Sequence, residues 1–283
     1  MTPKHKSPGA WIMIGVVAIY MGFLIGAPIS ALIIGAFGDG IAAFWQGITS
    51  HAFLQSLWLS LRIALLVVLF QAVFGTMIAW VLVRQEFLGK SFLNGLIDMP
   101  FAISSVVVGY MLLLLFGRNG FLFPVLEWLG ISVAFSVPGM FIATLFVSLP
   151  FMIREMIPAI DNLDRDQEFA AETLGANQWT IFFQVILPQL RSALIYGLTL
   201  TLARALGEFG AVLVIGGGVQ GRTETTTLYI FRSLDERQSI DAYTAAIVLG
   251  VFSVGVVFLA EGIKRRKGKK NTIEEQVSVF QSH

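Results

Sequence analysis

Two oppositely charged side chains lie inside a long apolar stretch of this 283-residue chain. Arg204 and Glu208 are four positions apart in LTLARALGEFGAVLVIGGG, which places both on one face of a helix. Charges inside an apolar segment are costly in lipid and are expected to face protein or water. Two interpretations stay open: an ion pair that neutralises both groups and anchors packing, or a water-lined path on which Arg204 meets an anion.

Small residues run beside this polar face. Ala203, Gly207 and Ala211 form a small-xxx-small stripe, which would let a second helix approach closely. The glycines at 216–218 are expected to end the helix and to permit an irregular segment after it.

A second polar feature begins with Asp98 and Pro100 in LIDMPFAISS. Proline bends a helix and leaves carbonyl groups free, and irregular backbone at membrane depth is tolerated where it faces protein or a water-filled cavity. Ser104 and Ser105 follow one turn later. They either line such a cavity or bond back to the helix backbone, and we favour the backbone bonds.

Several kinds of chemistry have no motif in the sequence. No GxxxxGK[ST] phosphate loop is present, so the chain is not expected to bind and hydrolyse ATP itself. The three histidines have no metal-ligand spacing, no GxSxG motif occurs, and cysteine is absent. We predict no catalytic residue, metal site or bound cofactor, and therefore no enzyme.

The composition indicates the elements that must position these residues. Hydrophobic residues make up 56% and charged residues 13% of the chain, and the mean hydropathy is +0.78. A soluble domain carries about 25% charged residues, so we predict an all-α polytopic membrane protein. The net charge of +1 gives no reason to expect a nucleic-acid partner.

Six apolar runs are long enough to cross about 30 Å of hydrocarbon. They are continuous rather than alternating, which argues against a barrel, and an even number of spans puts both termini on one side. The runs cover approximately 11–36, 56–83, 92–116, 134–157, 193–217 and 240–261.

The positive-inside rule places both termini in the cytoplasm. Most of the 19 Lys and Arg residues then lie inside, and the outer loops hold only Arg118, Arg222, Arg232 and Arg237. The basic tail at 262–283 is interpreted as a stop-transfer anchor near anionic lipid. The expected organisation is 1–54 for the first helix and its flanks, 55–261 for the transport domain, and 262–283 for the tail.

A polar segment interrupts the apolar chain between the fourth and fifth spans. Residues 161–178 read DNLDRDQEFAAETLGANQ and predict a short amphipathic helix that Asp164 and Gln167 cap in a capping box and Gly175 ends. Its acidic residues would be repelled by anionic lipid. A cytoplasmic surface of small residues rimmed by acids is suited to insertion into a cleft of a soluble partner.

The run AAETLGANQWTIFFQVILP resembles the EAA motif of ABC importer permeases. Ala170, Ala171, Gly175, Leu187 and Pro188 match that motif, and Val185 takes its isoleucine place. Phe169 stands where the family has glutamate, with Glu168 before it and Glu172 after it. The resemblance implies that loop 161–190 docks on an ATPase through Glu168, Phe169, Ala170, Ala171, Glu172, Gly175 and Pro188.

The segments LIDMPFAISSVVVG, FGRNG, PFMIREMIP, ARALGEFGAVLVIGG and TAAIVLG are similar to the sulfate/thiosulfate (CysW-type) permeases and to the related molybdate permeases. The resemblance implies a type I ABC importer fold in a bacterial inner membrane. It also implies two ATPase subunits that bind Mg-ATP, a second permease that is either similar or identical, and an extracytoplasmic binding protein that delivers an oxyanion.

Sulfate or thiosulfate is the expected substrate, with molybdate or tungstate as the alternative. An alternative from another class is a secondary anion transporter or channel that needs no ATPase, because the Arg204–Glu208 pair also suits ion coupling. The hydroxyl-rich segment TETTT at 223–227 is expected to be an ordinary solvated loop, or else to meet the binding protein or the oxyanion.

Overall fold

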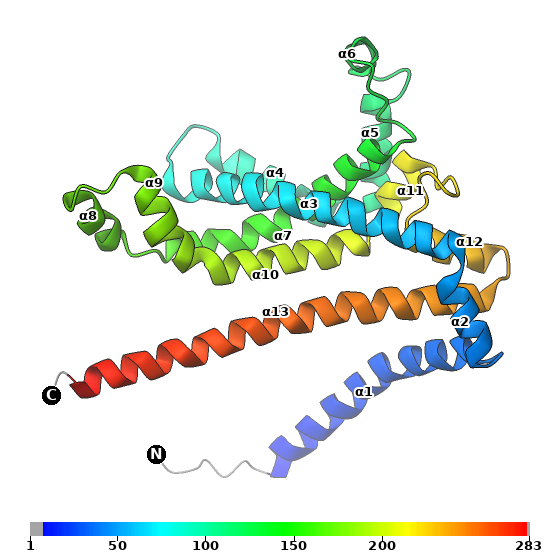
Figure 1. Ribbon diagram of the computed structural model, residues 1–283, viewed down its shortest axis with the longest axis horizontal. Helices are drawn as coiled ribbons and strands as arrows, with labels where there is room; N and C mark the ends of the chain where they lie inside the picture. The colour runs from blue at the N-terminus through cyan, green and yellow to red at the C-terminus, as the bar shows by residue number, and fades with distance from the viewer. Residues whose placement is uncertain (1–7, 282–283) are drawn as a thin grey trace.

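The computed structural model describes residues 8–281, and all the regular elements within them are helices (Figure 1). This confirms the all-α prediction. The elements are α1 (Pro8–Ala36), α2 (Ile41–Thr49), α3 (His51–Arg84), α4 (Lys90–Ala102), α5 (Ser105–Phe116), α6 (Phe123–Trp128), α7 (Val137–Asp161), α8 (Arg165–Thr173), α9 (Gln178–Ile181), the π-helix η1 (Phe182–Ile186), α10 (Leu187–Leu206), α11 (Gly210–Gly216), α12 (Thr226–Asp235) and α13 (Ser239–Gln281).

Five helical stretches are long and apolar enough to cross a membrane, and a bent pair supplies a sixth. The five are Trp11–Ala36, His51–Arg84, Val137–Asp161, Gln178–Leu206 and Ser239–Leu259. The six predicted runs therefore all correspond to helices, but the third and the fifth are not continuous.

The third run is broken into α4 and α5, which meet at an angle of 116°. Pro100 lies near the end of α4 and cannot donate to the carbonyl of Leu96. Ile103 then takes extended backbone and Ser104 begins the new helix. Figure 1 shows α5 standing away from the long helices, with α6 at its tip.

The fifth run is also broken, and it begins much earlier than predicted. Its helical stretch starts at Gln178 rather than near residue 193, and α10 ends at Leu206. Two glycines at 207 and 210 flank the break. Because glycine has a low helix propensity, interrupting the helix here costs little free energy. The expectation of one helix through residue 217 was wrong, because α11 is a separate short helix.

Close packing of α3, α7 and α10 forms the centre of the bundle. Met152 of α7 is fully buried between two glycines. A Cβ atom at Gly75 of α3 would lie 2.8 Å from Cγ of Met152, and one at Gly197 of α10 would lie 2.8 Å from its Sδ. The absence of these two side chains lets three helices meet around one flexible thioether.

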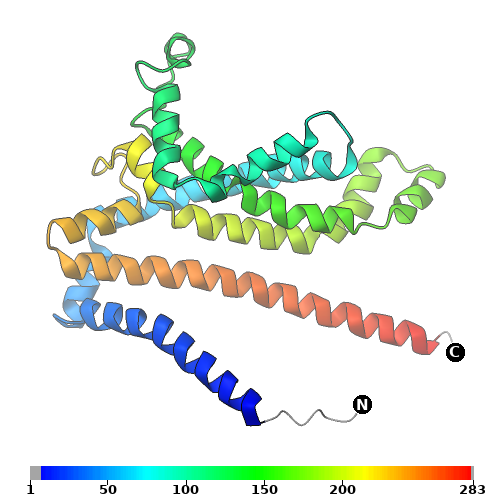
Figure 2. The ribbon, with the colours of Figure 1, turned by 180° about the vertical axis from the view of Figure 1, so that it is seen from behind.

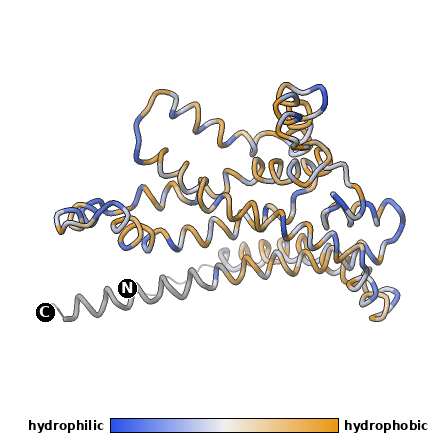
Figure 3. The backbone as a smooth tube through the Cα atoms, turned by 45° about the horizontal axis from the view of Figure 1, so that its top comes forward, coloured by the Kyte–Doolittle hydropathy of each residue, from blue (hydrophilic) through white to orange (hydrophobic). Residues whose placement is uncertain are grey.

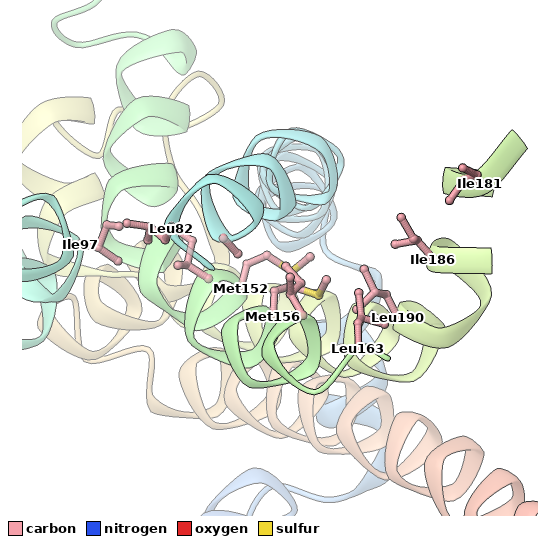
Figure 4. Packing of buried hydrophobic residues seen from close by; sticks show 11 residues of the cluster. Leu82, Ile97, Met152, Met156, Leu163, Ile181, Ile186 and Leu190 are labelled. Atoms are coloured by element: carbon pink, nitrogen blue, oxygen red, sulfur yellow. The ribbon is translucent and has the colours of Figure 1, made fainter. Parts of the chain in front are cut away.

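This cluster of buried side chains continues to the end of the bundle that carries α8 (Figure 4). Leu82 of α3 and Met156 of α7 belong to the same cluster as Met152, and Leu163 and Leu190 extend it toward the α7–α8 and η1–α10 connections. Ile181 and Ile186 complete it from α9 and η1. The apolar core of the bundle therefore reaches the base of the polar segment.

The start of α1, the end of α13 and the helix α8 lie toward the same end of the molecule, and α2 and α12 lie at the other (Figures 1 and 2). Figure 3 shows hydrophilic stretches at these two ends, with α8 among them, and apolar helices between. The basic residues Lys4 and Lys6 lie outside the described residues, as do the side chains of the basic tail from Lys264 onward.

Candidate functional site

The helix α8 is capped at its start by Asp164, as the sequence predicts. Its carboxylate accepts a hydrogen bond from the amide N–H of Asp166 at 3.0 Å and one from Nε2 of Gln167 at 3.4 Å. The capping box is therefore modified, since the Gln167 side chain bonds to the cap side chain rather than to its backbone N–H. Asp166 and Glu168 in the first turn add favourable interactions with the helix dipole.

Gly175 ends α8 with a φ of 84°, a left-handed conformation that glycine adopts without penalty. Its N–H bonds to the carbonyl of Glu172 at 2.9 Å, and the N–H of Ala176 bonds to the carbonyl of Ala171 at 3.1 Å. These two bonds form a Schellman motif. The predicted C-terminal stop at Gly175 is confirmed. A Cβ at this position would meet nothing within 4 Å, so glycine is required for its backbone conformation and not for lack of space.

The two faces of α8 differ in what they contact. Glu168 and Ala171 are half-buried against the bundle, and Ala171 packs on the core cluster. The opposite face is open to solvent and apolar at its centre: Phe169 is 59% exposed and Leu174 is 88% exposed. Glu172 and Ala170 are also exposed, and Glu172 forms no ion pair with any residue that the structure describes.

Glu168 is engaged within its own chain. Its carboxylate accepts a hydrogen bond from Nη2 of Arg84, the last residue of α3, and the two form an ion pair. The guanidinium group also lies over the ring of Trp80, 5.0 Å from its centroid. Of the two acids that flank Phe169, one is thus bound to the bundle and the other is free to meet a partner.

The remaining motif residue, Pro188, lies in the first turn of α10 rather than at the end of a loop. A proline inside a helix lacks the N–H for the preceding turn and clashes with it. The π-helical turn η1 ends at Ile186, two residues before Pro188, and such a turn can accommodate that defect. Gln189 next to it donates to Oε1 of Gln167 at 3.2 Å, which gives α8 a second polar contact, this time with α10.

The charged pair of the fifth span forms, but in a different setting from the one predicted. Arg204 Nη1 lies 2.7 Å from Glu208 Oε2, in agreement with an ion pair. Glu208 lies in the break between α10 and α11 rather than on a continuous helix face, and only 2% of its side chain is exposed. Its Oε1 accepts the N–H of Ala211 at 3.0 Å, so this carboxylate also caps α11.

The small-residue stripe does not form as one face, since the helix ends inside it. Gly207 is exposed and Ala203 is half-buried, whereas Ala211 belongs to α11 and is fully buried. Ala211 does permit a close helix crossing, but with α5: a Cβ at Gly109 would lie 2.7 Å from the carbonyl oxygen of Ala211. The two broken spans therefore cross each other through Gly109 and Ala211.

Ser104 and Ser105 begin α5 at this crossing. Within the part of the chain that the structure describes, neither hydroxyl makes the expected bond back to the helix backbone. Ser105 instead lies against α11, where a Cβ at Gly210 would lie 2.5 Å from its Oγ. The expected backbone bonds were wrong because Ser104 opens a new helix and has no preceding turn to bond to. A role in a polar path stays a prediction.

The hydroxyl-rich segment 223–227 is buried rather than solvated, which corrects the expectation of an ordinary loop. Thr226 has no exposed surface, and Ser60 Oγ of α3 accepts its N–H at 2.8 Å. Thr227 Oγ1 donates to the carbonyl of Glu208 at 2.7 Å. The segment therefore fixes the break in the fifth span from the α12 side.

Two further ion pairs were not anticipated from sequence, one between distant segments and one between residues eight positions apart. Arg154 of α7 holds Asp98 of α4 through two nitrogens, with Nε 2.7 Å from Oδ1. Arg232 of α12 holds the buried Glu224, with Nε 2.6 Å from Oε1, and this hydrogen bond raises the pKa of Arg232. The signal that could have indicated the first pair is a lone carboxylate, Asp98, in an apolar segment, since such a group requires a partner.

The family described as "binding-protein-dependent transport system inner membrane component" matches residues 71–269. The chain belongs to this family. It is therefore a membrane component of a transport system rather than an enzyme. The match covers most of the predicted transport domain at 55–261, whose boundaries stay a prediction.

Three relatives are similar over nearly the whole chain. "Sulfate permease 2, chloroplastic" of Chlamydomonas reinhardtii is 43% identical over 89% of this chain and 69% of that protein. "Sulfate transport system permease protein CysW" of Synechococcus elongatus is 40% identical over 95% and 94%. "Sulfate transport system permease protein CysT" of Escherichia coli strain K12 is 35% identical over 95% and 98%.

Solved structures confirm the fold. A chain of a bacterial ABC transporter that imports the acidic polysaccharide alginate superposes with a TM-score of 0.74 at 19% identity, covering 90% of this chain and 94% of that one. The type I ABC importer fold expected from the EAA-like motif is thereby confirmed.

Proposed function

We propose that this chain is the membrane-spanning permease of an ATP-driven importer for sulfate or thiosulfate. One observation supports it most: α8 presents Phe169 and Leu174 to solvent while its other face is fixed to the bundle, in a chain that has no phosphate loop. Large exposed apolar side chains at such a surface are typical of a protein-interaction site. The ATPase that α8 would meet supplies the energy, and Mg-ATP binds there.

The substrate assignment is supported by the relatives, whose names specify sulfate over nearly the whole length of this chain. Both CysW and CysT permeases are among them, so we propose a similar but distinct second permease beside this one. Two ATPase subunits and an extracytoplasmic binding protein complete the assembly.

The proposed orientation puts α8, the start of α1 and the end of α13 in the cytoplasm, where ATP is available. The excess of basic residues in the same segments supports this orientation through the positive-inside rule. The loop between α11 and α12 and the helix α2 then face outward, toward the binding protein.

The test is uptake of radiolabelled sulfate by proteoliposomes that contain the permease pair, the ATPase and the binding protein. We expect uptake only with ATP inside and with all components present. Thiosulfate is expected to compete, and molybdate to compete weakly. Uptake by this chain alone under an ion gradient would show a secondary transporter instead, and competition mainly by molybdate would reassign the substrate.

The role of α8 is tested by Leu174→Ser, which removes the most exposed apolar side chain of that helix. The matched control is Leu88→Ser, because Leu88 is fully exposed in the turn between α3 and α4. We expect Leu174→Ser to reduce ATPase co-purification and the control to leave it unchanged. If both variants bind the ATPase equally well, α8 is not part of the ATPase interface.

A further inference from the structure

Glu168 and Arg84 come from segments that the chain connects only over a long distance. They are 84 residues apart in sequence, one at the end of α3 and the other in the first half of α8. The covalent neighbours of α8 are α7 and α9, so this ion pair adds a contact with a helix to which α8 has no direct chain connection. That contact lies at the base of the surface proposed to meet the ATPase.

The pair is shielded from water on the side of Arg84. Only 10% of the Arg84 side chain is exposed, against 22% of the Glu168 side chain. Nε of Arg84 is buried with no hydrogen-bond partner among the described residues, and Trp80 covers the guanidinium group. Glu168 is thus the acid that compensates a largely buried cation, and separating the two would leave that charge without a partner.

This arrangement argues against Glu168 as a docking residue. A carboxylate that left Arg84 to bind an ATPase would exchange a shielded ion pair for an exposed one, which is the weaker kind. Phe169, Glu172 and the C-cap residue Leu174 are already exposed and need no such exchange.

We propose that Glu168 and Arg84 are positioning residues that make α8 and the inner end of α3 move as one body. This inference rests on the proposed function, since it requires an ATPase that displaces α8. The displacement would pass to α3 through the ion pair and then to α7 and α10 through the packing of Gly75 and Gly197 on Met152. The hydrogen bond between Gln167 and Gln189 also links α8 to the bundle, through α10.

The experiment measures ATP hydrolysed per sulfate imported in proteoliposomes of the full complex. The variants are Glu168→Gln, Arg84→Met and the double variant, since methionine keeps an apolar stem against Trp80 without the charge. The control is Glu86→Gln, which removes a neighbouring but exposed ion pair with Lys90 at 2.7 Å. A loss of folded protein lowers hydrolysis and uptake together, so their ratio reports coupling rather than stability.

We expect each single variant to raise the ratio about tenfold while ATPase co-purification stays normal, and the double variant to equal the worse single one. Glu86→Gln should keep the wild-type ratio. Three outcomes would overturn the inference. The effects of the two single variants could multiply in the double variant, or either single variant could keep the wild-type ratio. Glu168→Gln could also lose ATPase binding. If instead no ATPase co-purifies with the wild-type chain, the proposed function itself is overturned.

Discussion

Nε of Arg154 donates to Oδ1 of Asp98 over 2.7 Å, which joins α7 to α4 shortly before the third span breaks. Both side chains are partly exposed, at 33% and 47%. Because two guanidinium nitrogens bind the carboxylate, this ion pair is expected to be stronger than a surface pair with a single contact.

Replacement of Asp98 by Asn should therefore destabilise the protein moderately. We expect a loss of about 1 kcal/mol, because exposure screens the interaction. Thermal unfolding of the purified protein in detergent measures it, with Asp39→Asn as the control at an exposed position. Equal melting temperatures for the two variants would show that the pair contributes nothing.

A methyl group at Gly75 should disturb the centre of the bundle. Gly75→Ala places a Cβ 2.8 Å from Met152 Cγ, and overpacking of this kind costs about 1–3 kcal/mol. Gly95→Ala in α4 is the matched control, since its Cβ would meet nothing within 4 Å. Unfolding in detergent should separate the variants, and Met152→Ala should partly rescue Gly75→Ala by opening space. Additive losses in that double variant would contradict the proposed clash.

Loss of Arg204 should cost more than loss of the whole pair. Glu208 has 2% exposed side chain, and an uncompensated buried charge costs about 3–5 kcal/mol. Arg204→Gln is therefore expected to unfold far more readily than Arg204→Gln/Glu208→Gln. The exposed Arg222→Gln is the control in the same denaturation series. If the single variant is as stable as the double one, the pair does not neutralise Glu208.

Ser60→Ala should loosen the segment at 223–227, which packs beside the break in the fifth span. The Ser60 hydroxyl accepts the N–H of the fully buried Thr226 at 2.8 Å, and an unsatisfied buried donor costs about 1–3 kcal/mol. Faster hydrogen exchange at residues 223–227 is the expected result. Ser30→Ala, which removes an exposed bond to the backbone of its own helix, should leave that exchange unchanged. Unchanged exchange in Ser60→Ala would mean that other contacts hold the segment.

The ends of α8 illustrate what the sequence alone could predict. Asp164 and Gly175 are local signals, and both cap the helix as expected. The six apolar runs likewise follow from composition and length. These features depend on residues a few positions apart, which is the range over which propensity and capping act.

The partners of Asp98 and Glu168 could not be predicted, because they come from distant segments. The sequence offers Glu168 as a candidate docking acid, but it does not indicate that Arg84 contacts this carboxylate. The break after Leu206 was missed for a related reason. At the break, Thr227 Oγ1 donates to the carbonyl of Glu208, and the Glu208 carboxylate accepts the amide N–H of Ala211. Neither contact is visible as a pattern in the sequence.

The breaks after Ala102 and after Leu206 divide two of the spans into a piece nearer α8, which is α4 or α10, and a piece farther from it, which is α5 or α11. The pieces α5 and α11 pack on each other and on the first half of α7, whereas α4 and α10 pack on the second half of α7, near the base of α8. Sequence changes in α5 and α11 are therefore expected to affect the part of the chain that carries α8 less than changes in α4 and α10 do. Such a division would allow the cargo preference of an importer to diverge among descendants that retain the same motor.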